Sequence, residues 1–114
     1  MSDNLLLAQM RRDREKRVTV GEWTFVVRRP TDLEITEFKG KLDQRKILER
    51  FVLDWSGLLE RDLIRNGTDR EIEFDRAIFL EFIEDKPDLW NVITKAVTEA
   101  YQAHKEATEE SVKN

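Results

Sequence analysis

The sequence predicts a small α+β domain, mainly α-helical, in which an N-terminal β-hairpin packs on a bundle of about four helices. Three observations predict it. Residues 17–29 alternate apolar and polar side chains with a period of two, as strands do. Residues 42–107 instead carry apolar side chains three and four positions apart, as core-facing helices do. A length of 114 residues fits one domain.

The composition excludes several classes of protein. The chain has no cysteine and a single histidine, His104, so it has neither a disulfide framework nor a multi-histidine or cysteine metal site. No apolar run approaches the ~20 residues that a membrane helix needs. The apolar residues 5–8 precede Arg11 and Arg12, which is the wrong order for a secretory signal. We therefore expect a cytoplasmic protein without cofactor, metal or membrane contact.

The first 16 residues are expected to form a marginal helix or a mobile arm. Leu6, Leu7 and Met10 fall on a narrow apolar face that stops at Met10. Residues 1–30 hold seven basic and four acidic side chains, whereas residues 31–114 hold thirteen and twenty. The basic run over residues 11–17 can contact phosphate, but two acidic residues interrupt it. A solvated segment is therefore a better interpretation than a nucleic-acid arm.

A hairpin is predicted over residues 17–29. Gly21 and Glu22 separate two strand-like runs, and glycine at the first central position suits a type II′ turn. Residues Arg28 to Pro30 end the pairing, because proline has no N–H to donate. A hairpin of this length must lay its apolar face on helices to be stable. The predicted inward set is Val18, Val20, Trp23, Phe25 and Val27.

Two helices are predicted to follow the hairpin. Thr31 and Glu34 have the spacing of a capping box, which begins a short helix ending near Gly40. A longer helix is predicted over residues 42–55, where Ser56 and Gly57 stop it. Its apolar stripe would be Ile47, Leu48, Phe51, Val52 and Trp55.

Residues 56–74 are the least regular part of the chain, with a turn at Asn66-Gly67 and a short extended segment over residues 71–74. Asp75 has the character of a helix N-cap, and Phe74 and Phe79 have the spacing of a hydrophobic staple. This pattern predicts a helix over residues 76–85. Its inner face would be Ile78, Phe79, Phe82 and Ile83.

The last predicted helix begins at Pro87, which suits the first helical position, and runs to about residue 107. His104 is expected at the partly exposed edge of its stripe. Residues 108–114 are expected to be a polar, frayed end, so the globular domain would span residues 17–107. The predicted stripe is Leu89, Trp90, Ile93, Ala96, Val97, Ala100 and Tyr101.

No arrangement of residues predicts catalysis. The carboxylates Glu81, Glu84, Asp85 and Asp88 fall on polar helix faces or at helix ends, where they complement the helix dipole. Residues 66–69 are a turn and only a fragment of a calcium loop. The four glycines are scattered at turns and caps, so no phosphate-binding loop exists. We do not expect an enzyme.

Large apolar side chains are more numerous than a small core easily hides. Three tryptophans, six phenylalanines and an irregular segment rich in leucine suggest that some apolar surface meets a partner. The predicted partner-binding residues are Trp55, Leu58, Leu59, Leu63 and Trp90.

The order of four segments resembles the tail assembly chaperones of long-tailed phages and prophages. These are residues 52–58 (VLDWSGL), 71–75 (EIEFD), 79–83 (FLEFI) and 87–90 (PDLW), followed by a helix with small residues. The resemblance covers residues 18–103. It implies a non-catalytic protein of the infected bacterial cytoplasm that is absent from the finished virion. Such chaperones coat the helical tape measure protein and help to recruit tail tube subunits.

Two other functions stay open. The chain can be a minor virion component, such as a tail or head-completion protein. It can also be a small regulatory or nucleic-acid-binding protein that uses its basic N-terminal arm. Self-association into a homo-oligomer is compatible with each function, because surplus apolar surface serves that purpose too. Members of the resembled family often have a second form, made longer by a ribosomal frameshift, and this chain would be the short form.

Overall fold

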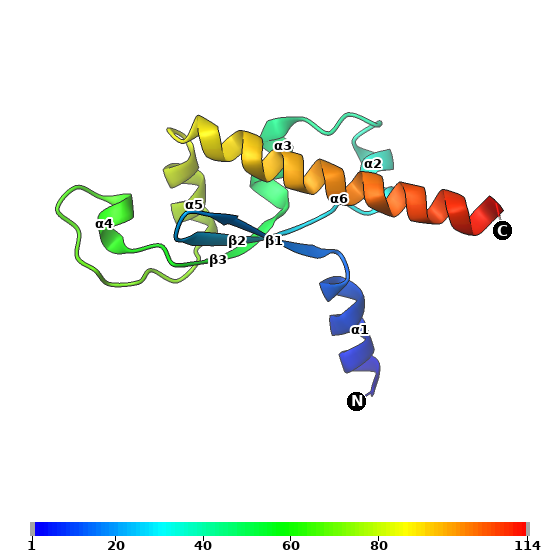
Figure 1. Cartoon of the computed structure of the whole chain (residues 1–114), viewed down its shortest axis with the longest axis horizontal. Coiled ribbons are helices and arrows are strands. Elements are labelled where there is room, and N and C mark those ends of the chain that lie inside the picture. Colours follow the sequence, from blue (N-terminus) through cyan, green and yellow to red (C-terminus); the bar gives the residue numbers. More distant parts are fainter. Residues whose placement is uncertain (1, 114) are drawn as a thin grey trace.

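A three-stranded antiparallel sheet forms the centre of the domain, and helices cover one of its faces (Figure 1). The structure is a computed structural model that describes residues 2–113, with side chains described for residues 3–110. The strands are β1 (Glu15–Val20), β2 (Trp23–Arg28) and β3 (Val52–Ser56), in the order β1-β2-β3. The α+β class predicted from the sequence is confirmed.

The predicted hairpin is present with the predicted register at its turn. Val20 lies opposite Trp23, and Val18 lies opposite Phe25. Gly21 adopts a φ angle of 60°, which the first central position of a type II′ turn requires. Val18, Phe25 and Val27 are buried, and the two residues nearest the turn are partly buried. Alternation therefore identified the inward face of this hairpin correctly.

The third strand is a correction to the helix predicted over residues 42–55. Helix α3 (Gln44–Arg50) begins at its cap Asp43 but ends at Arg50, and the chain then pairs with β2 as β3. Phe25 lies opposite Trp55, and Val27 lies opposite Val52. A helix continued to Trp55 would leave the second edge of β2 without hydrogen-bond partners. Pairing of β3 satisfies that edge and still buries both Val52 and Trp55.

Within residues 2–113, six helices replace the four or so predicted from the sequence. Residues 2–12 are helical, which is one of the two alternatives predicted for this arm, and one helical turn interrupts the segment that was expected to be irregular. The last helix continues to Lys113 instead of ending near residue 107, while Met1 and Asn114 lie outside the described residues. Besides α3, the helices are α1 (Ser2–Arg12), α2 (Asp32–Glu37), α4 (Glu60–Leu63), α5 (Arg76–Ile83) and α6 (Pro87–Lys113).

Local helix signals in the sequence are confirmed in detail. The amide N–H of Glu34 donates to the Thr31 hydroxyl over 3.1 Å, and the Thr31 N–H donates to the Glu34 carboxylate over 2.9 Å, which completes the capping box. The Ile78 N–H donates to the Asp75 carboxylate over 3.0 Å at the start of α5. These caps depend only on residues a few positions apart, and for that reason they could be predicted.

The core lies between the inner face of the sheet and helices α3, α5 and α6. Phe25 and Val27 meet Phe79 of α5 and Ile93 of α6 there, all fully buried. Ile78, which was expected on the inner face of α5, is instead 40% exposed. The eight-residue helix directs Phe79 and Ile83, four positions apart, at the core, and this orientation turns Ile78 toward solvent.

The start of α2 is tied to the sheet by a partly buried ion pair. The guanidinium of Arg28 donates to both oxygens of Glu34, over 2.7 and 2.9 Å, and Arg50 lies 3.6 Å from the same carboxylate. These bonds, of which those from Arg28 are strongest, lower the pKa of Glu34 from 4.5 to about 2. Ionised Glu34 therefore stabilises the fold.

This pair predicts a stability difference that depends on pH. Because the pKa of Glu34 is depressed in the folded state, its contribution is complete above about pH 4.5 and is lost as the pH falls toward 2. Glu34→Gln keeps the capping interaction and should cost about 1–3 kcal/mol at pH 7. Urea unfolding of both proteins from pH 7 to pH 2.5 measures this difference. A gap that stays constant over that range would contradict the assignment.

Candidate functional site

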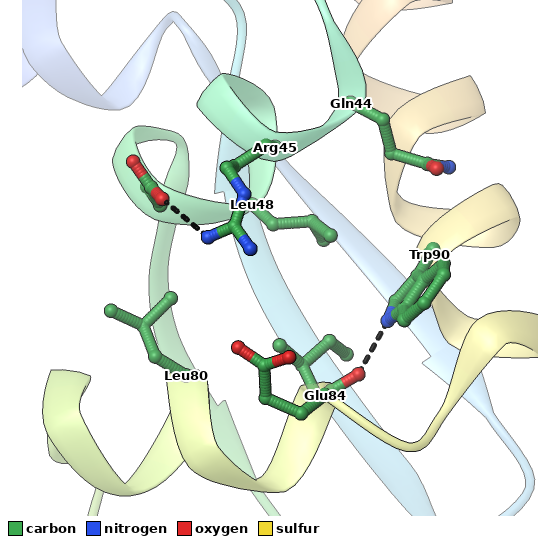
Figure 2. Close-up of a pocket in the computed structure, with 8 residues that line it drawn as sticks. Gln44, Arg45, Leu48, Leu80, Glu84 and Trp90 are labelled. Atoms are coloured by element: carbon green, nitrogen blue, oxygen red, sulfur yellow. Dashed lines mark hydrogen bonds and ion pairs between the residues drawn. The ribbon is translucent and has the colours of Figure 1, made fainter.

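An open groove with a volume of about 300 Å³ lies where α3 faces α5 and the first turns of α6 (Figure 2). It combines apolar walls with a charged rim, which suits the binding of another molecule. The lining residues are Gln44, Arg45, Leu48, Glu49, Leu80, Ile83, Glu84 and Trp90.

The corner between α5 and α6 builds one wall of this groove. Pro87 begins α6 only four residues after α5 ends, so the chain turns sharply there. The Trp90 indole N–H donates to the carbonyl oxygen of Ile83, which fixes the ring against the end of α5. Because the ring is only half-buried, one part of a large and rigid apolar surface stays accessible.

The floor and the walls of the groove differ in burial. Leu48 and Ile83 are 7% and 4% exposed and belong to the hydrophobic core. Leu80 is half-buried, packed on the core but open to the groove, and it faces the opening in Figure 2. Leu80 and Trp90 are thus the apolar side chains that a bound molecule can reach without any rearrangement of the core.

The rim carries charges of both signs. Arg45 donates to Glu49 over 3.2 Å, one turn apart on α3. Glu84 is exposed, and no ion pair to it is found among the described side chains. Glu81 and Asp85 are exposed beside it at the end of α5. A ligand with basic groups at the end of an apolar face would therefore match the α5 side of the groove.

Two of the five predicted partner-binding residues lie in the core. Trp55 is 5% exposed and Leu58 is fully buried, so the apolar surface expected around them is not formed. The expectation depended on Trp55 ending a helix, whereas on β3 its side chain points inward. Leu59 and Leu63 are half-buried at the two ends of α4, and neither lines the groove. Trp90 is the predicted residue that the structure places in the groove, although its role in binding stays a prediction.

Sequence reasoning missed Leu80 as a groove residue. It falls outside the stripe assigned to the inner face of α5, and its only signal was an apolar side chain at a position expected to face solvent. Leu48 was found, but as a core residue. The groove joins elements that lie about 40 positions apart in the chain, so no local pattern could reveal it.

The C-terminal part of α6 lies outside the groove and is held against α2 by polar contacts. The Tyr101 hydroxyl donates to Asp32 over 2.8 Å, and the His104 ring nitrogen lies 3.2 Å from the other oxygen of the same carboxylate. The hydrogen bond from Tyr101 contributes most to a lowered pKa of Asp32. His104 is partly exposed, as expected from its place on the stripe. These contacts connect α6 to α2 and offer no reactive pair.

Within the described part of the chain, no group of three or more histidine, aspartate or glutamate side chains is arranged to hold a metal ion. In the same residues, no helix has both the length and the apolar character needed to cross a membrane. No known protein family has a model that matches the sequence, and comparisons with curated proteins and with solved structures find no match.

The difference in burial between Leu80 on the wall of the groove and Leu48 on its floor predicts different effects on stability. Leu80→Glu should lower the free energy of unfolding by only about 1 kcal/mol, because the side chain is partly buried at the open side of the groove, where a carboxylate can reach water. Leu48→Ala should cost about 2–4 kcal/mol, because it leaves a cavity under α3. Chemical denaturation of the two variants tests the assignment. Equal losses would show that Leu80 belongs to the core.

Proposed function

We propose that this protein is a tail assembly chaperone of a long-tailed phage or prophage. In this proposal it is a non-catalytic protein that binds the helical tape measure protein and helps to recruit tail tube subunits during tail morphogenesis. It would act in the cytoplasm of the bacterial host and be absent from the mature virion. The observation that carries the proposal is the open apolar groove formed by α3, α5 and α6.

The shape and lining of the groove support a helical ligand. An amphipathic helix presents apolar side chains at spacings of three and four, and it binds by inserting them between the helices of its receptor. Leu80 and the flat Trp90 ring offer contact area with little entropy to lose. A core floor of Leu48 and Ile83 keeps this surface in one shape before the ligand arrives.

The charge of the chain supports a role in keeping a partner dissolved. Charged residues make up 39% of the sequence, and the net charge is −4. A tape measure protein exposes long apolar faces until the tail is assembled around it. Covering those faces with a protein whose outer surface is strongly charged keeps the complex in solution.

Co-expression with the tape measure protein from the same gene neighbourhood tests the proposal. We expect the tape measure protein to stay soluble and to co-purify with this chain. Leu80→Glu should reduce co-purification at least about tenfold, since it places a charge in the apolar contact. Leu33→Glu is the matched control, because Leu33 is 71% exposed on α2, outside the groove. An insoluble tape measure protein, or equal capture by both variants, would count against the proposal.

Mass spectrometry of purified particles separates the proposal from its alternative, a minor structural protein of the tail or head. The chaperone should be missing from finished virions, whereas a structural component should be present in fixed copy number. Detection of the chain at the level of known minor tail proteins would reject the chaperone role. The third function, a regulatory or nucleic-acid-binding protein that uses the basic N-terminal arm, predicts that the protein retains DNA or RNA in a salt-sensitive way.

A further inference from the structure

Helix α1 carries four of the eight large apolar side chains that are exposed in the described part of the chain. Leu6, Leu7 and Met10 are 57%, 45% and 50% exposed. At 3.6 residues per turn these three side chains fall within an arc of about 100°, which is the width of a helix face that normally packs on a partner. Leu5 is 75% exposed and lies outside this arc. We call the three residues the α1 face.

The α1 face cannot be covered by the groove of its own chain. Figure 1 shows α1 projecting from the sheet on the side opposite to α3 and α6. Asp13 and Arg14 alone connect α1 to β1, and two residues span at most about 7 Å. Since β1 is fixed by its pairing with β2, the helix cannot swing past the sheet to reach the groove.

The charges of α1 and of the groove rim indicate which molecule occupies the groove. The first 30 residues have a surplus of basic side chains, and the rest of the chain has a surplus of acidic ones. Helix α1 ends in Arg11 and Arg12, immediately after the α1 face. The groove is apolar at Leu80 and Trp90 and carries the exposed Glu84 on its α5 side. An apolar face that ends in two arginines therefore matches an apolar groove with an acidic side.

We propose that α1 of one copy of this protein docks in the α3–α5–α6 groove of a second copy. Leu6, Leu7 and Met10 contact Leu80 and Trp90 of that copy, and Arg11 and Arg12 lie beside its Glu84. The inference depends on the exposed face and the charges, not on the proposed function. If this docking and the proposed function both hold, the docked α1 covers the groove and the α1 face until a helix of the tape measure protein displaces it.

Directed disulfide crosslinking tests this contact. Because the sequence has no native cysteine, a disulfide can form only between the introduced residues. Met10→Cys and tagged Glu84→Cys proteins, mixed and oxidised, should form a disulfide-linked species that contains one chain of each. The matched controls are Leu5→Cys with Glu84→Cys, and Met10→Cys with Glu37→Cys at the far end of α2. We expect the mixed species at least tenfold more abundant in the first pair. Equal yields in all three pairs would overturn the proposal.

Sedimentation of the full-length proteins over a concentration series gives an independent measurement. The unmodified protein should sediment above the 13.6 kDa of one chain, and its association should weaken as salt is added. Leu6→Glu/Met10→Glu should weaken association at least about tenfold. This double variant should fold as the unmodified protein does, because every described α1 side chain is exposed. Leu5→Glu should associate as the unmodified protein does.

Three results would overturn the proposal. They are a single-chain mass at every concentration, association that survives Leu6→Glu/Met10→Glu, and binding of a monomeric protein to anionic vesicles through α1. The last would make α1 a membrane-surface helix instead. Capture of the tape measure protein is a separate readout, and Leu6→Glu/Met10→Glu should keep it. Failure of self-association therefore leaves the chaperone proposal standing, and the reverse also holds.

Discussion

The packing of Trp55 on the inner face of the sheet is the interaction on which the rest of the structure depends. Its ring makes edge-to-face contacts with Phe74, Phe79 and Phe82, at centroid distances of 5.3, 6.2 and 6.3 Å. Its indole N–H donates to the carbonyl oxygen of Ile72 over 2.7 Å. One side chain on β3 thus fixes both the segment before α5 and the orientation of α5 itself.

The groove follows from that orientation. With Phe79 and Ile83 turned into the core, α5 presents Leu80 and Glu84 on the side that faces α3. The short turn into α6 then brings Trp90 against the end of α5, where its indole is fixed by a hydrogen bond to a backbone carbonyl. The receptive surface is therefore supported by the core rather than carried on a mobile loop, which suits the recognition of a partner with a regular shape such as a helix.

The molecule separates its two apolar surfaces. The α1 face and the groove lie on opposite sides of the sheet, so neither can cover the other within one chain. Exposed apolar side chains that gather on one face often mark an interaction site. The proposed docking of α1 in a neighbouring copy would cover both surfaces, and charged residues make up 39% of the sequence.

The sequence by itself determined the hairpin, its inward face and the caps of α2 and α5, because each depends on residues within a few positions of one another. Tertiary structure alone decided the fate of residues 52–56. The spacing of Val52 and Trp55 suits a helix stripe, but the unpaired edge of β2 selects a strand, and an irregular register between Val26 and Val27 allows both side chains to be buried. That choice buried Trp55 and Leu58, which the sequence had assigned to a partner, whereas Trp90, assigned to the same partner, lines the groove. The packing of the whole core decides which apolar side chains stay outside it. Local sequence patterns carry no information about that packing.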